Sequence, residues 1–298
     1  MATSKSTSNG IAFGLVAAGI WGAWPVFSQL GLGQTLTAYD ITALRFGISG
    51  LVLAPIILRC GTGGLGWGRA IFLAVGAGVP YVLICVGGLA FAPAGHAGVI
   101  TPSCMLICST LGGWWVLGDR PTRQRIWAMA VMIAGVGLIG GQGFSGLGGE
   151  VWLGDMMFCV GGMLWASYTV AIRRWAVDSL HATALVSVLS MALYLPLYAI
   201  FNPGNLWTAP ISEIAFQGVF QGLGAAILAL LAYSRAVAIL GAARGALFAA
   251  LVPGIAVLLA VPLLGEHPSP EEWIGVVIVT AGIGWAMSPT SQVSTQRV

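Results

Sequence analysis

The chain has 298 residues, of which 58% are hydrophobic and only 7% charged, and its mean hydropathy is +0.93. A soluble domain carries about 25% charged residues, so this composition cannot cover a surface that faces water. It predicts an integral membrane protein whose surroundings are a lipid bilayer. The net charge of +3 is too small to indicate a nucleic-acid partner.

Ten segments are long and apolar enough to span a membrane, for which a helix needs about 20 mostly apolar residues. Polar or Gly/Pro-rich breaks separate them and leave no room for a soluble domain. The first segment follows a polar tail without a small-x-small cleavage site, so we interpret it as a transmembrane helix and not as a signal peptide. The sequence predicts an all-α integral membrane fold with spans near 11–31, 38–58, 70–91, 94–117, 126–141, 152–173, 182–201, 214–237, 243–264 and 273–288.

The basic residues predict the orientation of these spans. With the N-terminus in the cytoplasm, eleven of the twelve Lys and Arg residues fall inside or at inner helix ends, as the positive-inside rule requires. The twelfth, Arg45, lies within the second span. Seven of the nine acidic residues fall at or near the opposite side. Both termini are therefore expected in the cytoplasm.

Two loops share a frame and differ in charge. G-D-R-P at 118–121 and G-E-H-P at 265–268 lie 147 positions apart, and the same offset places A-G-V-G at 134–137 on A-G-I-G at 281–284. Chance matching is the alternative in a chain with 44 glycines. The shared spacing from the proline to the second glycine favours an internal repeat.

A repeat of this size holds five spans. Because five is an odd number, the two copies cross the membrane in opposite directions. Inverted repeats are typical of secondary transporters, whose binding site lies near the midplane between the halves. We therefore expect one transmembrane domain made of a first repeat at 1–145 and a second, inverted repeat at 146–298.

Several short motifs of the chain resemble those of the drug/metabolite transporter superfamily, in its EamA family of ten-helix carriers. They are W-G-A-W at 21–24, A-L-R-F at 43–46, G-D-R-P at 118–121, A-V-A-I-L-G-A-A-R-G-A-L at 236–247, L-V-P at 251–253, L-L-G-E-H-P at 263–268 and A-G-I-G at 281–284. The chain departs from the family pattern at Asp119, where the usual residue is Glu, which keeps the charge. The tryptophan-rich helices are most similar to the aromatic amino acid exporters of the YddG type.

This resemblance implies an exporter in a bacterial inner membrane that works by alternating access. The implied substrates are amino acids, aromatic or otherwise neutral, and related small amphipathic solutes. No obligate protein partner is evident from the sequence.

Missing residue types exclude other chemistry. The single lysine, Lys5, lies in the polar tail, so the chain has no Walker A motif and no lysine for a retinal Schiff base. The five cysteines have no metal or disulfide spacing. We expect neither an enzyme nor a bound cofactor or metal. The lack of acids at helix centres favours a uniporter or weakly coupled exporter over a proton relay.

Aromatic residues near helix midpoints are the main candidates for substrate binding. Trp21 and Trp24 share one face of the first span at i and i+3. Trp165 and Tyr168 repeat this spacing in the equivalent sixth span, which predicts two pairs that face each other across the pseudo-two-fold axis. Tyr81 follows Pro80 in the third span. Stacking and cation–π contact are the expected interactions, and packing between helices is the alternative.

Three polar residues are lower-ranked candidates for substrate binding. Arg45 is a costly charge within a helix and calls for a partner or a wet cavity, although a purely structural bond would also explain it. His96 is expected in an outer turn, either near a cavity mouth or simply solvated. Gln221 shares a helix face with Gln217, where helix–helix contact is the alternative to substrate binding.

Two other functions compete with amino-acid export. A nucleotide-sugar or phosphate-ester antiporter of the same superfamily needs several basic residues in its cavity, and only Arg45 qualifies. A lipid-modifying membrane enzyme needs a buried cluster of acids or nucleophiles, which the sequence does not offer.

Overall fold

The computed structural model describes residues 2–144, 149–201, 203–241, 244–245 and 247–288, and the regular structure of these residues is entirely helical. The predicted boundary between the repeats, at residues 145 and 146, lies outside the described residues. The helices are α1 Ala2–Leu32, α2 Ala38–Cys60, α3 Trp67–Ala77, α4 Val79–Gly88, α5 Ala94–Leu117, α6 Arg123–Phe144, α7 Val151–Arg174, α8 Ser179–Phe201, α9 Ile211–Gln217, the π-helix η1 Gly218–Leu228, α10 Ala229–Leu240, the 3-10 helix η2 Leu247–Leu251, α12 Val252–Leu264 and α13 Pro270–Met287.

These helices form a multi-pass membrane bundle. Nine stretches of the described residues are long and apolar enough to cross a membrane, counting α3 with α4, α9 with η1 and α10, and η2 with α12 as single spans. The tenth predicted span is α13, an apolar helix of 18 residues with Glu271 and Glu272 in its first turn. The all-α membrane fold predicted from the sequence is confirmed.

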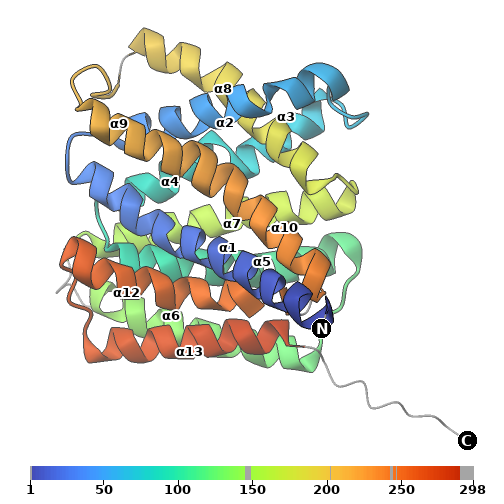
Figure 1. Ribbon diagram of the computed structural model, residues 1–298. Helices are drawn as coiled ribbons and strands as arrows, with labels where there is room; N and C mark the ends of the chain where they lie inside the picture. The colour runs from blue at the N-terminus through green and yellow to red at the C-terminus, as the bar shows by residue number, and fades with distance from the viewer. Residues whose placement is uncertain (1, 145–148, 202, 242–243, 246, 289–298) are drawn as a thin grey trace, which may run out of the picture.

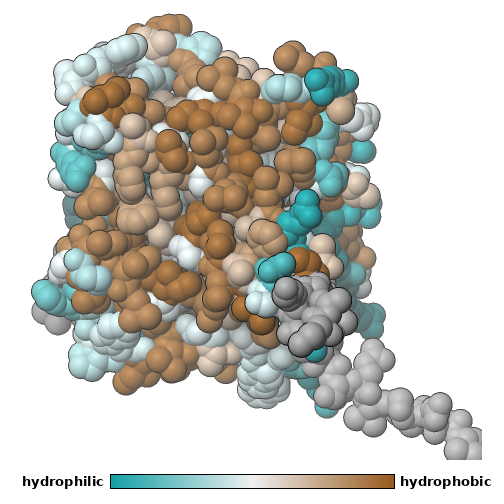
Figure 2. All heavy atoms as spheres, in the orientation of Figure 1, coloured by the Kyte–Doolittle hydropathy of each residue, from teal (hydrophilic) through white to brown (hydrophobic). Residues whose placement is uncertain are grey.

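The spans run side by side between two ends of the bundle, left and right in Figure 1. We call the left end, with the turns that precede α2, α5, α7, α9 and α13, the acidic end. The right end, with the N-terminus and the turns that precede α3, α6, α8 and η2, is the basic end. Figure 2 shows hydrophobic side chains over the middle of this face and hydrophilic ones toward both ends, the pattern of a bilayer-spanning surface.

The packing of the helices repeats when the two halves of the chain are exchanged. Three pairs join equivalent spans: α2 with α8, α5 with α12, and α6 with α13. The other contacts come in matched sets, because α1 packs on α12 and on α10 while α7 packs on α5 and on α3 and α4. With five spans in each half, this pattern is that of two inverted repeats.

Two equivalent spans, the third and the eighth, depart from regular α-helix. The third breaks at Gly78, where an added Cβ would lie 2.1 Å from the carbonyl oxygen of Ala74, and Pro80 follows without an N–H to donate. The eighth contains the π-helix Gly218–Leu228. Irregular turns of this kind often mark functional segments of helices, and these two carry Tyr81 and Gln221.

Candidate functional site

Four of the predicted aromatic residues form one continuous row between the halves. Trp24 of α1 stacks on Tyr81 of α4, with ring centroids 5.9 Å apart and planes at 14°. Tyr81 contacts Trp165 of α7 at 4.8 Å, and Trp165 contacts Tyr168 at 5.6 Å. We call these residues the aromatic row. Its rings come from both repeats, and Tyr81 makes the contact between Trp24 and Trp165.

Arg45 of α2 lies beside this row. Its guanidinium carbon is 5.6 Å from the centre of the Trp24 ring, a cation–π distance. The residue is only 7% exposed, and its Nε has no hydrogen-bond partner among the described residues. A buried donor without a partner costs free energy, and the Nε of Arg45 is such a donor.

The side-chain amide of Gln221 is fully used by the protein. Its Oε1 accepts a hydrogen bond of 2.8 Å from Trp24 Nε1, and its Nε2 donates to Ser28 Oγ at 2.9 Å and to Gln217 Oε1 at 3.2 Å. Gln217 in turn donates to the carbonyl oxygen of Phe27 at 2.6 Å. Helix–helix contact is therefore what the geometry of Gln221 shows, and the contact fixes the indole of Trp24.

Trp21 does not join the aromatic row. It lies one turn before Trp24 on α1 and contacts Tyr233 of α10, with centroids 5.3 Å apart and planes at 51°. The sequence analysis did not single out Tyr233, because its partner is 212 positions away along the chain (233 − 21) and only packing brings the two together.

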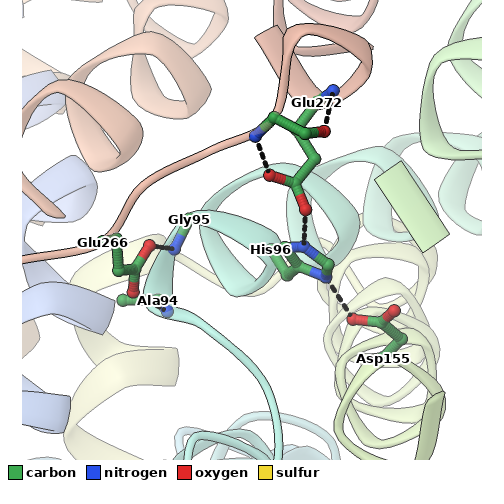
Figure 3. A network of polar contacts seen from close by, with 7 residues as sticks. Ala94, Gly95, His96, Asp155, Glu266 and Glu272 are labelled. Atoms are coloured by element: carbon green, nitrogen blue, oxygen red, sulfur yellow. Dashed lines mark hydrogen bonds and ion pairs between the residues drawn. The ribbon is translucent and has the colours of Figure 1, made fainter. Parts of the chain in front are cut away.

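His96 lies apart from the aromatic row, and the alternative of a solvated turn was wrong. Helix α5 begins at Ala94, which places His96 in its first turn at the acidic end, where it is only 6% exposed. Its Nδ1 lies 2.8 Å from Asp155 Oδ1, and its Nε2 lies 3.1 Å from Glu272 Oε1 (Figure 3). The residue therefore belongs to a polar cluster at the end of the bundle.

The connection between α12 and α13 extends this cluster. Glu266 accepts hydrogen bonds from the backbone N–H groups of Ala94, at 2.6 Å, and Gly95, at 3.1 Å (Figure 3). These are free N–H groups of the α5 N-terminus, where a carboxylate is stabilising. Burial nevertheless raises the pKa of the Glu266 carboxyl, against the effect of the two N–H groups. We call His96, Asp155, Glu266 and Glu272 the acidic-end network.

The counterpart of Glu266 in the first repeat is Asp119, at the basic end. Asp119 pairs with Arg173 Nη2 at 2.5 Å, and both side chains are about half exposed. The two equivalent acids thus have different partners: Glu266 holds the start of a helix from the other half, whereas Asp119 forms a surface ion pair.

Three cavities lie near the ends of the bundle. One of about 190 Å³ is lined by His96, Glu266 and Glu272 of the acidic-end network. A second, of about 500 Å³, lies between α1 and α9, and a third, of about 330 Å³, lies at the basic end beside Trp175. None of these three is lined by the aromatic row.

The fold and its packing symmetry define a multi-pass membrane protein of the transporter class. The model of the EamA-like transporter family matches residues 8–141 and again residues 152–288, once in each half. The chain belongs to this family, which is part of the drug/metabolite transporter superfamily. A solved structure titled only "Crystal structure of protein" shares the fold, with a TM-score of 0.63 and 22% identity over 94% of this chain and 97% of that one. No curated protein matches the chain.

Proposed function

We propose that this transporter exports small solutes that carry a carboxylate and an apolar or aromatic side chain, with neutral amino acids as the class that fits best. The observation that carries this proposal is the position of Arg45 beside the aromatic row. Such a solute needs a donor for its carboxylate and a surface for its side chain. The buried guanidinium, with its unpaired N–H, can supply the donor, and the row of rings from both halves can supply the surface.

The chemistry of each part is complementary to one end of an amino acid. The free Nε of Arg45 can donate to a carboxylate, and hydrogen bonds to charged groups contribute about 1.5–3 kcal/mol each. The faces of Trp24, Tyr81 and Trp165 can stack on an aromatic side chain or attract an ammonium group. We assign direct contact with the solute to the aromatic row and Arg45.

The remaining predicted site residues have supporting roles in this proposal. Gln221 holds the indole of Trp24 in place, and Trp21 continues the aromatic surface along α1 toward Tyr233. His96 acts at the acidic end and not on the bound solute. The repeats 1–145 and 146–298 move against each other, so that rings from the two halves separate and meet again as access alternates.

We propose that the acidic end faces away from the cytoplasm, in a bacterial inner membrane. Support comes from the charges, since Arg120 lies in the turn before α6 and Arg173 and Arg174 end α7, all at the basic end. Short loops rich in Arg and Lys are retained in the cytoplasm. Both termini are then cytoplasmic, and export runs from the basic to the acidic end.

The alternative of a nucleotide-sugar or phosphate-ester antiporter has weaker support. A substrate with two or more negative charges calls for several basic residues, and Arg45 is the one basic side chain in contact with the aromatic row among the described residues. Membership of a transporter family likewise favours transport over a lipid-modifying enzyme.

Flux into liposomes that contain only this protein tests the proposal. Vesicles loaded with unlabelled phenylalanine should take up labelled phenylalanine by saturable exchange, and Arg45→Gln should abolish most of this uptake. Arg69→Gln is a matched control, because Arg69 makes a cation–π contact of 5.4 Å with Trp175 at the basic end. Exchange of nucleotide sugars but of no amino acid would overturn the proposed substrate class.

A further inference from the structure

The acidic-end network buries ionisable groups that the proposed binding of the solute does not use. His96 is 6% and Asp155 is 5% exposed, and burying charged groups is costly unless they are paired. The network also joins the two halves of the chain. His96 lies on α5 of the first repeat, whereas Asp155 lies on α7 and Glu272 on α13 of the second.

The two hydrogen bonds of His96 require one more proton than a neutral imidazole and two ionised carboxylates carry together. A neutral imidazole carries a single N–H, and an ionised carboxylate accepts but cannot donate. In this structure both ring nitrogens face carboxylate oxygens, Nδ1 toward Asp155 and Nε2 toward Glu272. Both bonds can exist together only if the ring is doubly protonated or one carboxyl holds a proton.

Asp155 has an acceptor oxygen that no described donor uses. Its Oδ1 faces His96, but its Oδ2 is buried and has no hydrogen-bond partner among the described residues. Asp40, the other buried aspartate of the acidic end, differs in this respect. Both its oxygens accept bonds, one from Tyr198 and the other from the N–H groups of Thr37 and Asn205.

We propose that His96, Asp155 and Glu272 form a proton-binding site that holds the acidic end shut while it is occupied. The proton comes from water at the acidic end: a hydronium ion gives up one proton to the cluster and leaves as water. With the proton bound, α5 is tied to both α7 and α13. Without it, one of the two carboxylates faces an unprotonated ring nitrogen and its bond is lost.

The surroundings of the cluster contain no competing positive charge among the described residues that line it. The titratable groups that face it are Glu266 and His267 from the connection between α12 and α13, and Cys159 one turn further along α7. The cavity of about 190 Å³ against His96 has room for the water that delivers the proton.

This site makes opening of the acidic end depend on pH. Opening at the acidic end must separate α5 from α7 and α13, so proton binding and opening oppose each other and are thermodynamically linked. Low pH on the acidic side therefore holds that end shut and high pH releases it, and the proton enters and leaves the site by the same end. The inference requires a transporter but does not depend on which solute it carries.

Protonation of His96 can be observed directly in the full-length protein in lipid. The chain has three histidines, so nitrogen-15 NMR of histidine-labelled protein resolves few signals, and His96→Gln assigns the signal of His96. Asp155→Asn should move the titration of that signal to lower pH, because one negative charge is lost. Glu271→Gln is the matched control, since Glu271 is exposed in the same first turn of α13 as Glu272 and should leave the titration unchanged. A His96 titration that is the same in Asp155→Asn as in the wild type contradicts the proposal.

A second pair of variants does not touch the charged groups. Gly140 of α6 faces the unpaired oxygen of Asp155, where an added Cβ would lie 3.6 Å from Oδ2, an ordinary contact. Gly140→Ser places a hydroxyl donor beside the carboxylate and should also shift the His96 titration to lower pH. Gly140→Ala adds bulk without a donor and should not shift it downward. Equal titrations in the two variants would count against the role of the unpaired oxygen.

Flux measurements separate this inference from the identity of the solute. In liposomes, exchange of the solute by the wild type should slow as the pH on the acidic side falls, whereas exchange by Asp155→Asn should depend less on that pH. A pH dependence of exchange that is the same in Asp155→Asn and in the wild type overturns the role of the site in gating. If no tested amino acid is carried at all, the proposed substrate is wrong, and the NMR titration still decides whether the proton site exists.

Discussion

The ring of Tyr81, on α4 of the first repeat, lies 4.8 Å from the indole of Trp165, on α7 of the second. This contact joins the part of the aromatic row in the first repeat to the part in the second. In a transporter whose halves move against each other, it is a contact that has to part for a solute to enter the row. In the proposed function, the solute then lies between these two rings.

Trp165→Ala should weaken transport of aromatic solutes more than that of small ones. Contacts between aromatic rings contribute about 0.5–1.5 kcal/mol beyond the area that they bury, which corresponds to a change of about 2- to 12-fold in affinity. We therefore expect the KM for phenylalanine to rise by this factor, with less change for alanine. Trp127→Ala, at an exposed position on α6, is the control, and an equal rise for both solutes would argue against stacking.

Gln221→Leu should destabilise the protein by leaving the N–H of Trp24 without an acceptor. An unpaired buried donor costs about 1–3 kcal/mol, which thermal unfolding in detergent can detect. The double variant Trp24→Phe with Gln221→Leu removes both partners and should lose less stability than the sum of the single variants. Additive losses would show that the 2.8 Å contact does not couple the two residues.

Glu266→Gln should preserve part of the stability at neutral pH and flatten the dependence of stability on pH. The pKa of Glu266 is raised in the folded state, mainly by burial, so the folded protein holds this proton more tightly than the unfolded chain. The contribution to stability is then largest below the unfolded pKa and declines as pH rises through the folded pKa. The N–H groups of Ala94 and Gly95 donate to different oxygens of Glu266, so a glutamine keeps an acceptor for one of them and has no proton to lose.

Thermal unfolding measured from below the unfolded pKa of Glu266 to above its folded pKa checks this expectation. Glu266→Ala is the comparison, because it removes the acceptor and leaves two N–H groups of α5 unpaired, which should lower the unfolding temperature at every pH. A decline with rising pH that is as steep in Glu266→Gln as in the wild type would contradict the assigned cause.

Cys60 provides a test of the orientation. It is the exposed cysteine among the five and ends α2 at the basic end, whereas the other four are buried or half-buried within spans. A membrane-impermeant maleimide should label Cys60 in inverted vesicles and not in intact cells, and Cys60→Ser should remove the signal. Labelling in intact cells would place the basic end outside and reverse the proposed direction of export.

Much of the fold was predictable because short-range patterns encode it. Apolar runs give the spans, and the shared frame of G-D-R-P and G-E-H-P reveals the repeat that the helix packing then shows. The aromatic row was accessible in part, because the pair Trp21 and Trp24 and the pair Trp165 and Tyr168 share the i, i+3 spacing in equivalent spans, although Trp21 does not join the row. These signals lie within a few turns of each other or recur at a fixed offset.

The acidic-end network was not predictable by such patterns. His96 meets Asp155 and Glu272 across 59 and 176 positions, and no local spacing indicates that three different helices begin at the same place. The sequence indicated only a polar residue in a turn. The sequence analysis looked for acids at helix centres, whereas the buried acids Asp40, Asp155 and Glu213 lie near the helix starts.

Equilibrium binding of labelled phenylalanine to the purified protein tests the central claim most directly. The account predicts saturable binding that phenylalaninamide, which lacks the carboxylate, competes for poorly. Loss of one hydrogen bond to a charged group costs about 1.5–3 kcal/mol, which corresponds to a loss of about 10- to 150-fold in affinity. Arg45→Gln should show this loss of affinity and should no longer prefer the acid to the amide. Equal binding of the acid and the amide by the wild type, or unchanged binding in Arg45→Gln, would contradict the assignment of Arg45 and the aromatic row as the substrate site.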